Sequence, residues 1–341
     1  MTDIILSSFL IICALYLHNM SSLINIIFSF FAVISYLANL VEALSNEKFE
    51  DISIKLTILF NICMFASLFY LNIYYIYKFV VILIISLSII LLVNKNIFNL
   101  FVKKLNMNLQ WNRITHRIFF PLSLYVLLNP IGYVTTAGNH LMILLYGFFQ
   151  LMDQLSFHVL MFLYSFIGVG FGTRRGIYKC LNRLGIYIPN IKYVILGFVA
   201  VYLIDYIIWN VPLYISKLVY LIAPNIGIDI NTKMAVESSN VERVVQSINQ
   251  MAPSLTNIIF LSFIVGLSEE LLFRGALQPR FGNIYTSLLF TILHFQYFSI
   301  VALLDIFLIS YMLGIIRQKT NTSTTALIHT IYDFVSLTGL F

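Results

Sequence analysis

Long apolar runs separated by short polar connections dominate this sequence. The runs are continuous rather than alternating, a pattern typical of membrane-spanning helices. A helix needs about 20 mainly apolar residues to cross the hydrocarbon core of a bilayer. The runs that predict such spans are residues 4–17, 23–41, 56–77, 79–93, 118–136, one or two within 141–171, 193–222, 255–273, 284–298, 300–316 and 323–340.

The composition supports this interpretation. Of 341 residues, 60% are hydrophobic and 10% are charged, whereas soluble domains carry roughly 25% charged residues. Three cysteines, Cys13, Cys63 and Cys180, are far apart and lack the spacing of a disulfide framework or a zinc cluster. We therefore expect an all-α, polytopic membrane protein with about ten to eleven transmembrane helices.

The basic residues indicate an orientation in the membrane. The formal charge is +6, and most of the excess falls in connections between apolar runs, which predicts cytoplasmic loops rather than a nucleic-acid partner. We expect the N-terminus in the cytoplasm of a cell-membrane protein and the polar segment 224–254 outside. The two main clusters are Lys95, Lys103, Lys104, Arg113 and Arg117, and Arg174, Arg175, Lys179, Arg183 and Lys192.

Ionisable residues inside the apolar runs are candidates for function, because a charge at the bilayer centre costs about 2.5–3.5 kcal/mol even on the most lenient scale. Glu269 and Glu270 are about 100° apart around a helix, so they cannot point the same way. Glu270 stands four residues before Arg274, the favourable order for an ion pair. We therefore assign Glu270 to Arg274 and leave Glu269 free for chemistry.

Two further runs carry histidines. Phe290 is one helical turn from His294 and could pack beside it, and His329 and Asp333 are four apart on one face. If the three helices are neighbours, one glutamate, two histidines and one aspartate converge. Such a set can activate a water molecule or hold a metal.

The order Glu-Glu-x-x-x-Arg, Phe-x-x-x-His and His-x-x-x-Asn/Asp resembles the CAAX-protease and bacteriocin-processing membrane family (CPBP, or Abi), which includes the type II CAAX prenyl endopeptidases. The resemblance covers roughly residues 191–341. It predicts a CPBP-like protease domain there, after an N-terminal transmembrane region, residues 1–190, of unknown role.

This resemblance implies an intramembrane endopeptidase acting on a membrane-associated or lipid-modified peptide or protein, which enters from the bilayer or the cytoplasm. It implies that Glu269 and His294 activate water and that His329 and Asp333 stabilise the oxyanion, with Glu270, Arg274 and Phe290 in support.

One position departs from the family pattern. Members that act on prenylated substrates generally have Asn at the position of Asp333, and an ionised Asp cannot donate a hydrogen bond to an oxyanion. Either burial keeps Asp333 protonated, or it ligates a metal. The implied metal set, for zinc, is Glu269, His294, His329 and Asp333.

Two other functions fit the same residues. A catalytically silent scaffold or bacteriocin self-immunity protein would tolerate loss of Glu269, and a proton-coupled transporter could use buried carboxylates and histidines as a relay. The remaining buried groups are interpreted as packing residues: Asp205 and Asp305 as hydrogen-bonding residues between helices, and Asp153 and His158 as structural. The sequence gives no indication of the oligomeric state.

Overall fold

The computed structural model describes residues 36–44, 48, 50–52, 54–59, 86–118, 120, 123, 127, 151–222 and 230–339. Within these ranges the chain is helical, with a single bridge between Phe171 and Arg175 and no strand. The expected all-α fold is confirmed. The expected span at 4–17, most of those at 23–41, 56–77 and 118–136, and the starts of those at 79–93 and 141–171 lie outside the described residues.

Three helices in the described part are long and apolar enough to cross a membrane. They are α10 (Ile191–Ile222), a continuous helix over Leu255–Phe281, and α15 (Ile300–Lys319). The second consists of α12 (Leu255–Glu270), a π-helix η1 (Leu271–Leu277) and α13 (Gln278–Phe281). It continues past the end predicted at residue 273. This protein is therefore an all-α membrane protein.

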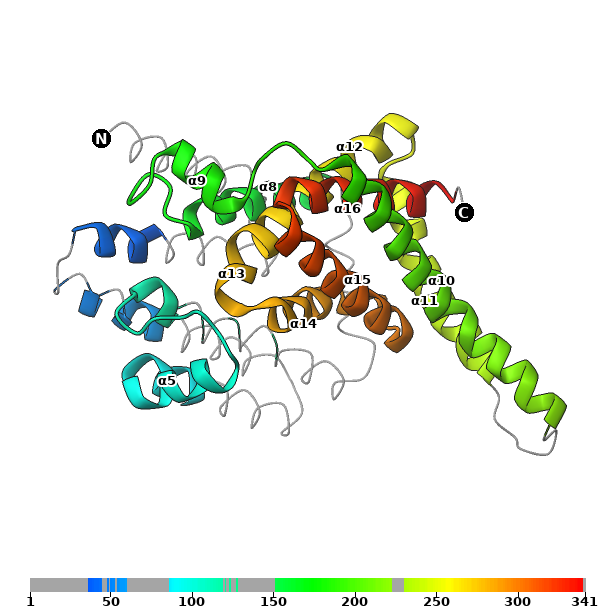
Figure 1. Cartoon of the computed structure of the whole chain (residues 1–341), viewed down its shortest axis with the longest axis horizontal. Helices are drawn as coiled ribbons and strands as arrows, with labels where there is room; N and C mark the ends of the chain where they lie inside the picture. Colours follow the sequence, from blue (N-terminus) through cyan, green and yellow to red (C-terminus); the bar gives the residue numbers. More distant parts are fainter. Residues whose placement is uncertain are drawn as a thin grey trace.

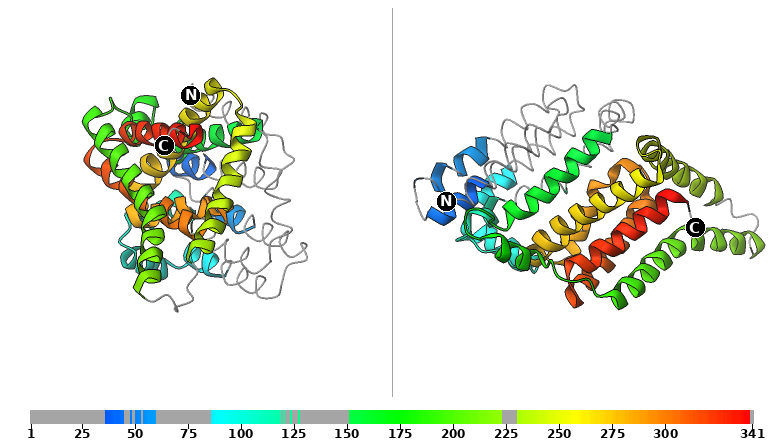
Figure 2. Two further views of the ribbon diagram at one scale, coloured as in Figure 1. Left: turned by 90° about the vertical axis from the view of Figure 1, so that its right-hand side faces the viewer. Right: turned by 90° about the horizontal axis from the view of Figure 1, so that it is seen from above.

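Four helices lie side by side in one row (Figure 2, right). The order is α8 (Leu151–Gly168), α12, α16 (Thr322–Thr338) and α10, and each packs against the next. Behind this row α15 packs against α10 and α14 (Asn283–Leu293). The row places the glutamates of α12 directly beside the histidine of α16.

The close approach of α12 and α16 depends on a glycine. A Cβ atom at Gly266 would lie 2.6 Å from Thr330 Oγ1 and 2.8 Å from its backbone nitrogen. Both helices begin at side-chain caps, since Ser254 Oγ accepts from the Asn257 N–H and Asn321 Oδ1 accepts from the Thr324 N–H. Local sequence thus fixes where each helix starts, and Gly266 fixes how near they come.

The expected span at 284–298 is wrong as a full crossing. Its helix, α14, has 11 residues, which is about 16 Å at 1.5 Å per residue and half of the hydrocarbon thickness. It ends before His294, a 3₁₀ turn η2 (Phe295–Tyr297) follows, and Phe298 adopts a left-handed conformation with φ 48°. The apolar run continues through this half-buried turn, although the helix ends before it.

The polar segment at 224–254 contains a helix, α11 (Ile230–Met251), which runs back along α10. The two form a hairpin that extends away from the bundle (Figure 1). Closer to the bundle α11 contacts η2, where the Asn240 side-chain amide donates to Phe298 O over 2.9 Å.

The described residues before 191 contact the C-terminal part of the chain. Helix α8 packs on α12 and η1, and α9 (Ile177–Leu184) also packs on η1. Nearer the N-terminus, the end of the expected span at 79–93 joins α5 (Lys95–Lys104) at a bend of 105°. The domain division near residue 191 stays a prediction.

Candidate active site

The two adjacent glutamates lie where α12 passes into the π-helix, near the midpoint of the candidate span Leu255–Phe281. Glu269 is 7% exposed and Glu270 is fully buried. π-Helical turns are rare and are frequent at functional sites. Both carboxylates face the protein rather than lipid.

Glu270 is held on several sides. Arg274 Nε lies 3.2 Å from its Oε2, as the four-residue spacing predicts, and His329 Nδ1 lies 3.3 Å from its Oε1. Thr325 also lies near it. Arg274 in turn donates from Nη2 to Ser310 Oγ over 2.9 Å. Glu270 therefore connects α12 to α16 and, through Arg274, to α15.

His329 lies at the centre of the site. While Nδ1 faces Glu270, Nε2 lies 3.5 Å from Asp333 Oδ1 and 3.8 Å from Glu269 Oε2. Glu269 Oε2 is buried and has no hydrogen-bond partner among the described residues. Of the two glutamates, only Glu270 has an arginine partner among the described residues, and Glu269 lacks one.

His294 joins this group through Phe290. The His294 Nδ1 atom lies 2.9 Å from Phe290 O, and since a carbonyl only accepts, Nδ1 carries the proton. The ring centroid of Phe290 is 4.5 Å from that of His294 and 5.9 Å from that of His329. Within the described part of the chain His294 has no direct hydrogen bond to Glu269.

Exposure differs across the site. The side chains of Glu270 and Arg274 are 0% exposed, that of His329 is 10% and that of Asp333 is 21%. The ion pair is therefore sealed within the protein, and the side of His329 that faces Asp333 is the more accessible one.

A zinc ion is implied by the resemblance, with Glu269, His294, His329 and Asp333 as ligands. Zinc requires ligand atoms that converge on one point at about 2.0–2.2 Å. Here the carboxylates face the imidazole nitrogens of His329 themselves, and no group of three such side chains among the described residues is arranged to hold a metal. The residues as arranged do not fit a zinc site.

Several further residues lie around this site. Thr325 stands one turn before His329, and Tyr297 stacks on His294 with ring centroids 6.3 Å apart. His158 of α8, interpreted as structural, lies 3.0 Å from Ser268 Oγ. Thr325 was detectable, since a polar residue four before a histidine shares its helix face, whereas the α8–α12 contact leaves no local signal.

The helix-bridging interpretation is confirmed for Asp205. The Tyr332 hydroxyl donates to Asp205 Oδ1 over 3.3 Å, joining α16 to α10. Asp305 of α15 lies near Asp205 and Trp209, and its bridging role stays a prediction. Asp153 has no described side chain.

The residues of this site lie within a match to a known family. Residues 251–335 match the family model described as "Type II CAAX prenyl endopeptidase Rce1-like". The chain is 39% identical over 84 residues to the "Uncharacterized protein YpbD" of Bacillus subtilis (strain 168), a match that covers 24% of this chain and 44% of that protein. No solved structure matches significantly. The resemblance predicted from three motifs is confirmed: residues 251–335 of this membrane protein are similar to the Rce1-like type II CAAX prenyl endopeptidases.

Proposed function

We propose that this protein is an intramembrane endopeptidase that hydrolyses a peptide bond in a membrane-associated or lipid-modified peptide or protein. The observation that carries the proposal is that Glu269 and Asp333 both lie within 3.8 Å of His329 Nε2. Glu269 is near the midpoint of a candidate span, and the motif histidine His294 is close to the same group. Buried ionisable groups are too costly in a membrane to be retained without a role. The Rce1-like match supports the same reaction.

Glu269 and His294 are the proposed general base. Because Nδ1 of His294 carries its proton toward Phe290 O, the Nε2 atom has a free lone pair. A water held between this nitrogen and the Glu269 carboxylate gives up a proton as its oxygen attacks the carbonyl carbon of the substrate. That proton later passes to the leaving nitrogen as the C–N bond breaks.

His329 and Asp333 are the proposed oxyanion stabilisers. His329 can serve in the form that carries a proton on Nε2, the nitrogen that faces Glu269 and Asp333. Asp333 can donate only while it is protonated. Glu270 acts through His329: its hydrogen bond to Nδ1 sets the ring so that Nε2 faces the reacting groups.

The proposed setting is the cell membrane, with the N-terminus in the cytoplasm and lipids as the surrounding partner. A peptide substrate would enter from the bilayer or the cytoplasmic side. We expect the approach from the side of Asp333, because Glu270 and Arg274 close the opposite side.

The test uses a strain that lacks the gene. This strain is complemented with the gene for the parent protein, for Glu269→Gln or for His294→Gln, and the peptides in the membranes of the resulting strains are compared. We expect the same uncleaved peptides to accumulate with either variant as with no complementation, at normal protein level in the membrane. Identical peptide sets in parent and variant strains would contradict the proposal. Normal bacteriocin resistance with Glu269→Gln would instead indicate a silent scaffold or self-immunity protein.

A further inference from the structure

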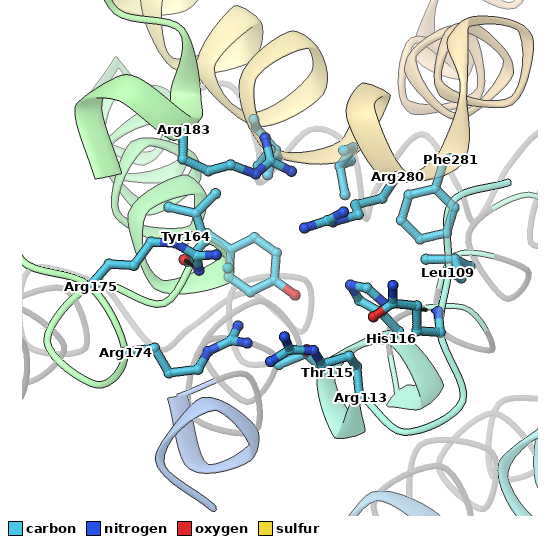
Figure 3. Close-up of a pocket in the computed structure, with 16 residues that line it drawn as sticks. Leu109, Arg113, Thr115, His116, Tyr164, Arg174, Arg175, Arg183, Arg280 and Phe281 are labelled. Carbon is cyan, nitrogen blue, oxygen red and sulfur yellow. Dashed lines mark hydrogen bonds between the residues drawn. The ribbon is translucent and has the colours of Figure 1, made fainter. Parts of the chain in front are cut away.

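A cavity of about 200 Å³ lies among the turn after α8, helices α9 and α13, and the segment at 109–116 (Figure 3). None of the candidate active-site residues lines it. Leu272 and Leu277 of η1 give it an apolar wall. Five arginines line it and converge on it from separate parts of the chain: Arg113, Arg174, Arg175, Arg183 and Arg280.

The positive charge around this arginine cavity is poorly balanced. Glu42 contacts Arg174 at 2.5 Å and Arg113 at 3.5 Å, and it also accepts from the backbone and hydroxyl of Thr115. Among the described residues, Arg175, Arg183 and Arg280 form no ion pair with a carboxylate. Five guanidinium groups therefore line the cavity. Among the described residues, the one carboxylate that pairs with any of them, that of Glu42, already contacts Arg113, Arg174 and Thr115.

Two of these three arginines are nevertheless oriented. Arg175 Nη1 donates to Val169 O, and Arg183 Nη1 donates to Gly275 O over 3.0 Å. These carbonyls fix the positions of the guanidinium groups without neutralising them. Topology alone predicts basic residues at a cytoplasmic end, but it does not require them to converge on one enclosed space.

The lowered pKa values of two of these arginines show that burying like charges together is unfavourable. Burial, helped by the neighbouring charges of Arg280, Arg317 and Arg175, lowers the pKa of Arg183 to about 10. Burial lowers the pKa of Arg174 as well, and Glu42 opposes this effect only in part. An anion placed between the guanidinium groups would relieve the repulsion.

His116 adds a neutral donor. Its Nδ1 accepts from the Gln110 N–H over 2.9 Å, so the ring proton is on Nε2. Burial, helped by the nearby arginines, lowers the pKa of His116 to about 3, so the ring is uncharged at neutral pH. The ring can donate a hydrogen bond without adding to the repulsion.

We propose that the arginine cavity binds a phosphate-class anion, the phosphate of a lipid headgroup or a soluble diphosphate. Planar guanidinium groups bind phosphate oxygens in pairs, and a multiply charged phosphate offsets more of the excess than a single carboxylate can. Pockets for drug-sized ligands have volumes of about 300–1,000 Å³. The arginine cavity is smaller, so a compact group suits it better than a large cofactor.

The test titrates the purified full-length protein in detergent with sodium diphosphate and, separately, with dioctanoyl phosphatidic acid. We expect Arg183→Gln and Arg280→Gln each to weaken binding about tenfold, as for loss of one charge-assisted hydrogen-bonded pair. Lys179→Gln is the matched control, since Lys179 is exposed on α9 and does not line the cavity. Arg280→Lys keeps the charge but loses the paired geometry, so we expect an intermediate affinity.

The two titrations distinguish the sources of the anion. Tighter binding of phosphatidic acid, with displacement by diphosphate, indicates a lipid headgroup, whereas diphosphate binding alone indicates a soluble ligand. Failure of both to bind the parent, or equal weakening by Lys179→Gln and Arg183→Gln, would overturn the proposal. Thermal unfolding without ligand shows whether each variant folds, and either arginine variant suffices if the other does not.

Discussion

His329 stands between two consecutive glutamates, with Nδ1 3.3 Å from Glu270 and Nε2 3.8 Å from Glu269. One imidazole thus contacts both carboxylates from opposite nitrogens. Glu270 also holds a fully buried arginine, whereas Glu269 Oε2 has no hydrogen-bond partner among the described residues. Adjacent positions in the chain are therefore suited to different tasks: Glu270 to holding the fold and Glu269 to chemistry.

The first prediction separates these tasks by stability. Glu270→Gln leaves the buried Arg274 without its counter-charge, so we expect the free energy of unfolding to fall by about 3–5 kcal/mol. Glu269→Gln removes no ion pair with an arginine and should change stability by much less. Thermal unfolding of both variants in the same detergent measures the difference. Equal losses would mean that the two carboxylates share one structural role.

The second prediction concerns turnover. Glu269→Gln and His294→Gln should each lower kcat by about 10²–10⁴, the usual contribution of a general base. The double variant should lose far less than the product of the single losses, because the two groups act on one water. His158→Gln is the control, since a glutamine can still bond to Ser268; we expect it to keep kcat within about tenfold.

A parent-like kcat in either single variant would contradict the proposed base. A loss in His158→Gln as large as that in His294→Gln would instead place His158 in the chemistry.

The sequence was sufficient to predict contacts within one helical turn. The Glu270–Arg274 pair and the packing of Phe290 on His294 follow from a four-residue spacing. It did not predict that the run at 284–298 breaks after 11 helical residues, because hydropathy reports burial and not helix continuity. Nor could it place Glu42 beside Arg113 and Arg174, since a contact across 71 or 132 residues depends on tertiary packing.

The third prediction tests the close contact of α12 and α16. An alanine at Gly266 would place its Cβ atom 2.6 Å from Thr330 Oγ1 and 2.8 Å from backbone, so the helices must separate. That movement draws Glu269 and Glu270 away from His329. We expect Gly266→Ala to lower both kcat and thermal stability, with an overpacking cost of about 1–3 kcal/mol.

Gly168→Ala is the matched control, because a Cβ atom there meets nothing within 4 Å. Its activity should stay close to that of the parent. Full activity in Gly266→Ala would show that the α12–α16 spacing is not critical to the site.

The fourth prediction is a pH dependence of anion binding in the arginine cavity. The pKa of Arg183 is lowered to about 10, so the guanidinium is charged at pH 8 and loses its proton as the pH rises through 10. Affinity for diphosphate should therefore fall between about pH 8 and 10.5. Calorimetric titration at several pH values measures this fall.

The Arg183→Gln variant tests whether deprotonation of Arg183 causes this loss of affinity. The variant should bind more weakly at pH 8 and show a smaller further loss toward pH 10.5. An equal decline in parent and variant would assign the pH dependence to another group.

The last prediction concerns Asp333, the position where prenyl-substrate members of the resembled family generally have Asn. Asp333 Oδ1 lies 3.5 Å from His329 Nε2, and the side chain is 21% exposed. If Asp333 donates a hydrogen bond to the oxyanion, Asn can replace it, because its amide is a permanent donor. We expect Asp333→Asn to keep most of the activity and Asp333→Ala to lower kcat about 10²–10³-fold, as for loss of one oxyanion donor. If Asp333 instead acts as an anion that orients His329, both substitutions should be equally damaging. Comparison of kcat for the two variants at equal membrane level therefore distinguishes donor from counter-charge, and equal loss would remove Asp333 from the oxyanion site.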